Sequence, residues 1–303
     1  MIAARARRVA LLALLVALSS ACSTAAHRSA TATTAVTTTT AEPTNTATTT
    51  TTAIAASSHK SRVAVWGDSL TLQAADALRV QGRAHGFDLT VYAFFGLAAC
   101  DVAPQIFPTL ERNPPDALVL AFTGNNFSPC MAQNGKPMTG AAYFATYRRD
   151  IEHLVDAASA YHIPVLLVGA PTFPAKENHP DRVELNHVYM QIAAARSGVS
   201  YASTAPAVSP LGFAARVACI AGETAAHGCS NGLITVRTGN GIHFDDPLAV
   251  ACPSARTSSD ACRYTAGGHR YANAIIAGLA IPGLSYHPAT SLVGVPIDTT
   301  QDG

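Results

Sequence analysis

The sequence predicts one α/β domain of three layers (α/β/α), in which helices cover both faces of a mostly parallel central sheet. Short apolar runs alternate with segments of helical periodicity along most of the chain. The apolar runs are continuous, as in strands that are buried on both faces of a parallel sheet. About 225 residues carry this pattern, which is enough for one domain with a substantial core.

The elements follow one another in a regular order. The expected strands are the apolar runs at 62–67, 88–94, 116–122, 163–169 and 199–203. The expected helices are the segments of helical periodicity at 70–85, 143–161, 183–196 and 267–279. Two stretches that contain Gly and Cys, 124–140 and 204–263, are expected to form loops over one edge of the sheet.

Residues 1–21 have the pattern of a signal peptide. Three arginines precede an apolar run at 9–18, which is too short to span a bilayer. The small residues 19–21 before Cys22 resemble a bacterial lipobox, although Leu18 lies one place further from the cysteine than usual. We therefore expect a lipid anchor at Cys22, with cleavage nearby by an ordinary signal peptidase as the alternative.

Residues 22–61 consist almost entirely of Thr, Ala and small polar residues. Such a composition has too little large apolar surface to offset the entropy of folding, so a disordered tether is expected. The predicted domain spans 62–281, and 282–303 is expected to be a C-terminal tail. This organisation predicts an exported protein, either held at the outer face of the bacterial cytoplasmic membrane or cell wall, or secreted.

The charge balance limits the classes of partner that the protein is expected to bind. The chain has 20 basic and 19 acidic residues, and loss of the three leader arginines leaves 17 basic residues and a net charge near −2. Nucleic acid is not an expected partner, because binding it requires clustered Lys and Arg. Membrane contact is expected only through the lipid anchor, and nothing in the sequence indicates an oligomeric state.

Seven cysteines are present, and six remain once Cys22 is assigned to the anchor. An even set in an exported chain predicts disulfides, with about 15 possible pairings for six cysteines. Zinc binding is the alternative, but the chain contains no Cys-x-x-Cys motif. Pairing of nearest neighbours gives Cys100–Cys130, Cys219–Cys229 and Cys252–Cys262.

The most informative motif is Gly67-Asp-Ser-Leu70, which directly follows the expected strand 62–67. Open α/β sheets place their reactive groups at the carboxyl ends of strands, and a helix N-terminus there favours developing negative charge. Ser69 is therefore a candidate nucleophile for acyl transfer. The alternative is that Asp68 and Ser69 only cap the following helix.

Two later segments complete the pattern, Gly124-x-Asn126 and Asn240-Gly-Ile-His243. Together with Gly67-Asp-Ser-Leu70 and Gly96 they resemble the blocks of the SGNH, or GDSL, hydrolase family. The resemblance covers about 62–280. It implies an SGNH hydrolase-like fold with Ser69 as nucleophile and His243 as base. The oxyanion hole would be formed by Ser69, Gly96 and Asn126, and no metal or cofactor is implied.

The last block departs from the family pattern, because Asn240 stands where an aspartate normally orients the histidine. Three interpretations are open. The amide oxygen of Asn240, or a backbone carbonyl, could accept the ring N–H of His243; Asp245 or Asp246 could supply a carboxylate; or the domain could bind a ligand without cleaving it. Arg237, just before the block, is expected to pair with an acidic neighbour.

The sequence thus predicts an exported serine esterase that acts through an acyl-enzyme on acyl or acetyl esters of envelope carbohydrates or lipids. An O-acyltransferase is a close alternative, because water and an alcohol compete for the same intermediate. A non-catalytic SGNH relative that binds an envelope glycan is the alternative from another functional class.

Overall fold

The structure is a computed structural model, and its described residues are 60–174, 181–237, 239–244 and 265–287. Several expectations lie outside the described residues. They are the signal peptide, all but the end of the tether, the anchor at Cys22, the carboxylates of Asp245 and Asp246, and the pair Cys252–Cys262.

The centre of the domain is a five-stranded sheet in the order β2-β1-β3-β6-β7. Each neighbouring pair in it is parallel, which confirms the predicted fold class. Each strand lies within a few residues of its expected position. The strands are β1 (Ser61–Gly67), β2 (Phe87–Ala93), β3 (Ala117–Ala121), β6 (Val165–Val168) and β7 (Val199–Ala202).

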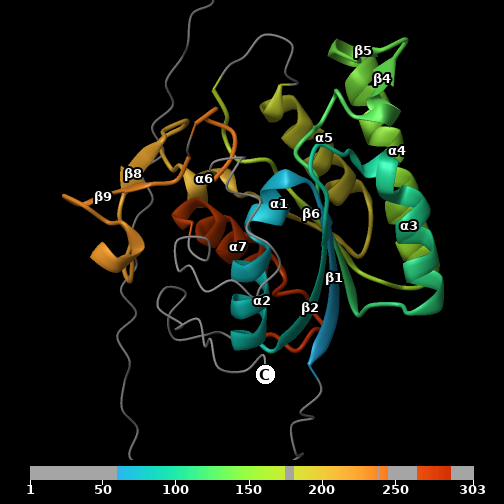
Figure 1. Cartoon of the computed structure of the whole chain (residues 1–303). Helices are drawn as coiled ribbons and strands as arrows, with labels where there is room; N and C mark the ends of the chain where they lie inside the picture. The colour runs from blue at the N-terminus through green and yellow to red at the C-terminus, as the bar shows by residue number, and fades with distance from the viewer. Residues whose placement is uncertain (1–59, 175–180, 238, 245–264, 288–303) are drawn as a thin grey trace, which may run out of the picture. The chain divides into compact units, whose positions relative to one another are not determined.

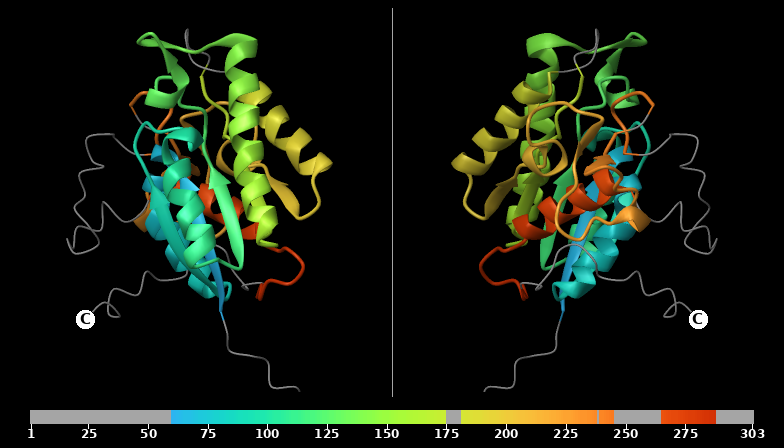
Figure 2. Two further views of the ribbon diagram at one scale, coloured as in Figure 1. Left: turned by 90° about the vertical axis from the view of Figure 1, so that its right-hand side faces the viewer. Right: turned by 90° about the vertical axis from the view of Figure 1, so that its left-hand side faces the viewer.

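Helices cover both faces of the sheet (Figures 1 and 2). One face carries α2 (Ala75–Ala84) and α7 (Ala266–Gly278), and the other carries α3 (Ala99–Arg112), α4 (Gly140–Ala160) and α5 (Arg182–Ala195). None of the helices in the described part of the chain is both long and apolar enough to cross a membrane.

Alternate residues of β1 build the two cores. Val63 and Val65 belong to the core beneath α2 and α7, whereas Ala64 and Trp66 belong to the core beneath α3, α4 and α5. This two-sided burial explains why the strand is continuously apolar, since successive side chains of a strand point to opposite faces.

The helix α3 was not among the expected elements. It contains Pro104 and Pro108, which lack the backbone N–H that a helix interior uses. Its apolar stripe is nevertheless regular: Val102, Ile106 and Leu110 are spaced by four residues and are fully buried. The expected helix 70–85 is also interrupted, because Ala74 separates a short helix α1 (Ser69–Gln73) from α2.

The two expected loop regions contain short elements. The first holds a 3₁₀ turn and an antiparallel hairpin, and the second holds a short helix, another hairpin and another 3₁₀ turn. In chain order they are η1 (Pro129–Met131), β4 (Ala132–Gln133), β5 (Lys136–Pro137), α6 (Ala205–Val208), β8 (Arg216–Ala218), η2 (Ala225–His227) and β9 (Leu233–Thr235).

Each of these regions contains a disulfide-bonded cysteine pair or one half of it, and both pairs are those that nearest-neighbour pairing predicts. Cys100 in α3 is bonded to Cys130 in η1, and Cys219 is bonded to Cys229 across the β8–β9 region. Cys100 and Cys130 also lie near Asp101 in a group of possible metal ligands. Because both sulfurs are used in the disulfide, they are not thiolate ligands.

Residues beyond 281 continue the fold as far as the structure describes them. The ring of Tyr286 stacks on His85 at 5.3 Å, between centroids. The N–H at His85 Nδ1 donates to the carbonyl of His287 at 2.8 Å, and the backbone N–H of Ser285 donates to Ser61 Oγ at 2.9 Å. The first strand and the last described segment are therefore held together.

Candidate active site

The ends of the three strands β1, β2 and β3 lie side by side. Gly67, the last residue of β1, is in register with Ala93 of β2 and Ala121 of β3. Because β2 and β3 flank β1, the strand order reverses here, and ligands of open α/β sheets bind at such a point. The turns that follow these three strands carry Ser69, Gly96 and Asn126.

Ser69 is the first residue of α1 and is 7% exposed. Its Oγ lies 3.0 Å from Nε2 of His243, which is 174 residues away in sequence and 8% exposed. A nucleophile within hydrogen-bond distance of an imidazole is the arrangement that serine acyl transfer requires. The structure thus brings together the two residues that the first and last blocks supplied.

Asp68 links the serine turn to the turn after β3. Its Oδ1 accepts the N–H of Leu70 at 3.1 Å and so caps α1. Its Oδ2 accepts both the N–H and the hydroxyl of Thr123, each at 2.6 Å. Burial raises the pKa of Asp68, and the bonds from Thr123 and Leu70 oppose that rise. Asp68 therefore caps α1 and also connects the serine turn to the turn after β3.

The expected oxyanion donors lie in connected turns. Gly96 has φ +73° and open space where a Cβ would stand, so its turn favours glycine and leaves room beside it. The amide nitrogen of Asn126 donates to the carbonyl of Met138 at 3.1 Å, and an amide nitrogen carries a second hydrogen. Asn125 joins the two turns by donating to the carbonyl of Leu97 at 2.9 Å.

Asn240 presents its amide nitrogen to His243, not the amide oxygen that one of the three interpretations requires. Its Oδ1 accepts the backbone N–H groups of Ile242 at 2.8 Å and of His243 at 3.1 Å. Its Nδ2 therefore faces Nδ1 of the His243 ring, at 2.8 Å. Rotating the amide would turn its N–H groups toward two backbone donors, so the hydrogen-bond network fixes this orientation.

The orientation of Asn240 determines which ring nitrogen of His243 carries the proton. An amide nitrogen only donates, so this orientation favours the tautomer in which Nδ1 accepts and Nε2 carries the proton. In this tautomer Nε2 donates to Ser69 Oγ and cannot take the serine proton. The same wrong tautomer accounts for a loss of about 10⁴ in turnover when asparagine replaces the aspartate of a serine protease triad.

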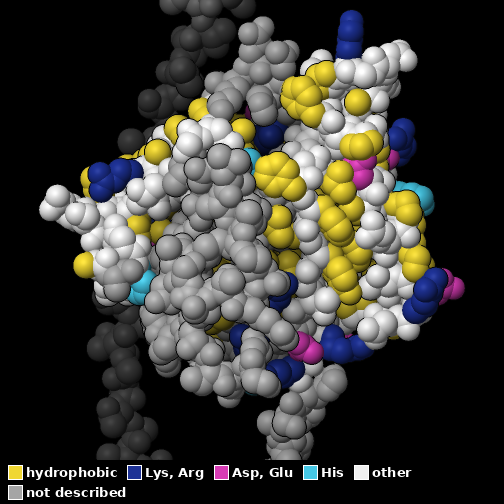
Figure 3. All heavy atoms as spheres, in the orientation of Figure 1, with side chains coloured by type: hydrophobic (Ala, Val, Ile, Leu, Met, Phe, Trp, Pro, Cys, Tyr) yellow, Lys and Arg dark blue, Asp and Glu magenta, His cyan; other side chains and the backbone are white. Residues whose placement is uncertain are grey.

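Phenylalanines border the site, and sequence reasoning did not identify them. Phe95, directly before Gly96, stacks on the His243 ring with centroids 5.5 Å apart and planes 11° apart, and it is 55% exposed. Phe127, directly after Asn126, is also exposed. In the space-filling view, hydrophobic side chains border the hollow above α1 (Figure 3).

Arg237 does not form the expected acidic pair. Its Nη1 donates to the carbonyl of Ile242 at 2.7 Å, and its guanidinium lies over the rings of Phe173 and Phe244. It is 1% exposed, and no carboxylate pairs with it among the residues that the structure describes. Burial lowers the pKa of Arg237 to about 9. The cation therefore anchors the turn that carries His243.

A family model described as "Protein of unknown function (DUF459)" matches residues 62–247, more than half of the chain. The chain belongs to this family. The DUF459 match begins within β1, includes all four blocks and ends just after His243. No protein with a curated description matches the chain.

Solved structures similar to the DUF459 chain include a lipase/acylhydrolase from Enterococcus faecalis, with 16% identity and a TM-score of 0.43 over 61% of this chain and 88% of that one. A GDSL-like lipase from Bacteroides thetaiotaomicron is 13% identical, with a TM-score of 0.39 over 60% and 79% of the two chains. A catalytic mutant of an acetylxylan esterase from Geobacillus stearothermophilus is 13% identical, with a TM-score of 0.39 over 48% and 77%.

The arrangement of the DUF459 chain agrees with the SGNH resemblance of its four blocks. Its parallel sheet places the turns after β1, β2 and β3 at one edge, and the late Asn240–His243 turn meets Ser69 there. The four blocks quoted from the sequence are thus parts of one site.

Proposed function

We propose that this DUF459 protein is an exported serine esterase of the SGNH type, acting on cell-envelope carbohydrate or lipid esters. The observation that carries the proposal is the distance of 3.0 Å between Ser69 Oγ and His243 Nε2 at the carboxyl edge of the sheet. The connected turns with Gly96 and Asn126 support it, because a developing oxyanion needs donors at that edge.

The reaction proceeds by two acyl transfers. Ser69 Oγ attacks the ester carbonyl, and His243 takes the serine proton and passes it to the leaving alcohol, which leaves an acyl-enzyme. A water molecule then attacks the acyl-enzyme; His243 accepts its proton and returns it to Ser69 as the acid departs. Transfer to a sugar hydroxyl would follow if an alcohol replaced that water.

Because of the orientation of Asn240, we expect the esterase to have a low turnover rate. His243 accepts the serine proton only in the tautomer that the Asn240 amide disfavours. The same observation supports a second candidate function, in which the site holds an envelope glycan without cleaving it.

Export rests on two supports. The first is the leader-like pattern of residues 1–21, with a lipid anchor proposed at Cys22. The second is the pair of disulfides Cys100–Cys130 and Cys219–Cys229, since disulfides persist mainly in oxidising compartments.

The test is to treat the purified protein, with its disulfides intact, and its Ser69→Ala variant with a fluorophosphonate probe and with p-nitrophenyl acetate. Labelling and hydrolysis that disappear in Ser69→Ala would establish the nucleophile. A folded wild-type protein that neither reacts with the probe nor hydrolyses the ester would favour the glycan-binding function.

A further inference from the structure

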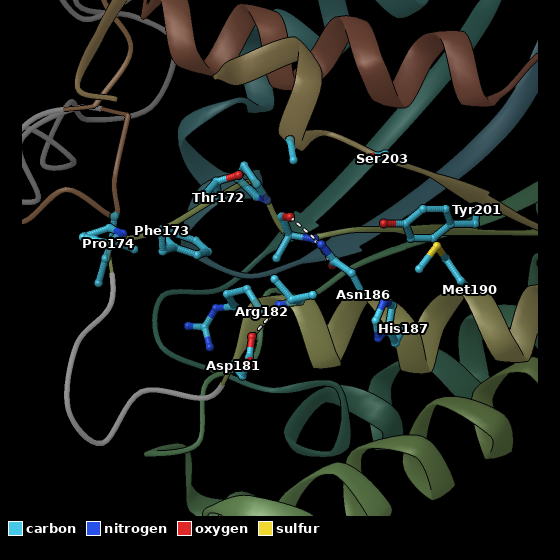
Figure 4. Close-up of a pocket in the computed structure, with 15 residues that line it drawn as sticks. Thr172, Phe173, Pro174, Asp181, Arg182, Asn186, His187, Met190, Tyr201 and Ser203 are labelled. Atoms are coloured by element: carbon cyan, nitrogen blue, oxygen red, sulfur yellow. Dashed lines mark hydrogen bonds between the residues drawn. The ribbon is translucent and has the colours of Figure 1, made fainter. Parts of the chain in front are cut away.

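A pocket of about 640 Å³ lies between the segment after β6, the first half of α5 and the His243 turn (Figure 4). Most of its wall is hydrocarbon, contributed by side chains such as Phe173, Pro174, Val183, Met190 and Ile242. Ile242 directly precedes His243, so the pocket reaches the turn that carries the catalytic base.

Three polar side chains of the wall have partners within the protein. The amide of Asn186 accepts the N–H of Ala170 at 2.7 Å and donates to its carbonyl at 2.9 Å. Asp181 caps α5, accepting the N–H of Val183 at 2.8 Å, and the Arg182 guanidinium lies 4.9 Å from the centre of the Phe173 ring. The wall therefore offers a ligand mainly apolar surface.

The strand order places the pocket and Phe95 on opposite sides of Ser69. The pocket lies beyond β3, at the ends of β6 and β7, whereas Phe95 follows β2 on the other side of β1. An ester bound at Ser69 would therefore have the pocket on one side and the exposed ring of Phe95 on the other. A hydrocarbon arm loses more contact with water in the enclosed apolar pocket than against the single exposed ring of Phe95.

We infer that the pocket holds the hydrocarbon of the acyl group, so that the substrates are lipid-type esters with an acyl chain of medium or long length, in preference to acetyl esters. This inference rests on the proposed esterase function. It assigns the segment after β6 and the helix α5 a role in acyl-chain selection that no sequence block indicated.

The first measurement is kcat/KM for p-nitrophenyl acetate, butanoate and octanoate. Each methylene that becomes buried raises kcat/KM by up to about fourfold. We expect octanoate to exceed acetate by at least about tenfold. The variant Ser203→Trp, at an exposed position in the pocket wall, is expected to reduce this preference about tenfold. The matched control Ser159→Trp, on the exposed end of α4, should keep the preference within twofold.

A second measurement tests the pocket without turnover. Calorimetric binding of decanoate and butanoate to Ser69→Ala should show tighter binding of decanoate by at least about tenfold, and Ser203→Trp added to Ser69→Ala should remove the difference. Labelling of Ser69 by fluorophosphonate, with acetate as the best substrate and equal binding of both acids, would overturn the inference and leave the esterase proposal intact. Absence of labelling together with selective decanoate binding would overturn esterase function and retain the apolar pocket.

Discussion

The position of one proton on His243 sets the expected rate of this site. Asn240 donates to Nδ1 because two backbone N–H groups occupy its oxygen. An aspartate at this position would accept from those N–H groups with one oxygen and from Nδ1–H with the other. The proton would then leave Nε2, and His243 could take the proton of Ser69.

We therefore expect Asn240→Asp to increase kcat/KM for p-nitrophenyl acetate by at least about tenfold, with about 10⁴ as the upper limit. Steady-state hydrolysis assays of the two proteins measure the change. Asn113→Asp, the same substitution at an exposed position at the end of α3, is the control and should have no effect. An unchanged rate in Asn240→Asp would mean that another group already orients His243.

Arg237 is expected to increase esterase activity and to lower the free energy of unfolding. Its buried Nε and Nη2 have no hydrogen-bond partner among the described residues. We expect Arg237→Met to leave the free energy of unfolding unchanged or to raise it by about 1–2 kcal/mol. Esterase activity should fall about tenfold, because the Ile242 carbonyl loses its donor. Urea unfolding and ester hydrolysis measure the two effects, with the exposed Arg149→Met as control.

The difference in free energy of unfolding between Arg237→Met and the wild-type protein should depend on pH. Because burial lowers the pKa of Arg237 to about 9, the folded state binds this proton less tightly than the unfolded chain. Its contribution is unfavourable below pH 9 and diminishes as pH rises above it. The advantage of Arg237→Met should therefore be larger at pH 7 than at pH 10, and a loss of more than about 2 kcal/mol at pH 7 would contradict the expectation.

At the scale of elements, α3 and η1 hold the oxyanion turns in place. The Cys100–Cys130 disulfide joins the start of α3 to the segment after Asn126. Asp101 adds to this connection, since its carboxylate accepts the N–H of Cys130 at 2.9 Å and that of Ala98 at 2.8 Å. The turns after β2 and β3 are thus joined by a disulfide and by the hydrogen bonds of Asp101, in addition to the bond from Asn125 to Leu97.

Reduction of the folded protein is expected to abolish most esterase activity before helix content changes. The physical reason is that the oxyanion turns lose their cross-link while the sheet and helices keep their cores. Activity and far-UV circular dichroism, followed together in excess reductant, measure this. Comparing Cys100→Ser/Cys130→Ser with Cys219→Ser/Cys229→Ser identifies the responsible pair. Full activity in the first double variant would contradict the role given to it.

At the scale of the whole molecule, the last described segment closes the domain at the N-terminal end of β1. Tyr286 contacts both His85 and Phe87, with its ring centroid 5.3 and 6.0 Å from theirs. Tyr286→Ala is expected to lower the free energy of unfolding by about 1–2 kcal/mol, because an aromatic contact and part of its apolar cover are lost. Urea denaturation measures the loss, and the exposed Tyr161→Ala should cost less than about 0.5 kcal/mol. Equal effects of the two variants would show that the segment adds little.

The sequence by itself determined the fold class, the five strands and the four blocks of the site. Strands buried on both faces must be continuously apolar, so the ranges 62–67 and 116–122 could be predicted as strands from the sequence alone. The helix α3 was missed because Pro104 and Pro108 interrupt its pattern, although Val102, Ile106 and Leu110 kept a spacing of four residues.

Only the tertiary structure decided how the site residues face one another. Either end of the Asn240 amide could meet His243, and the choice depends on where the N–H groups of Ile242 and His243 point. The stacking of Phe95 on His243 and the pocket beside Ile242 likewise join segments far apart in the chain. Sequence patterns record which residues are buried, but hydrogen-bond direction and cavity shape arise from the packing of elements against one another.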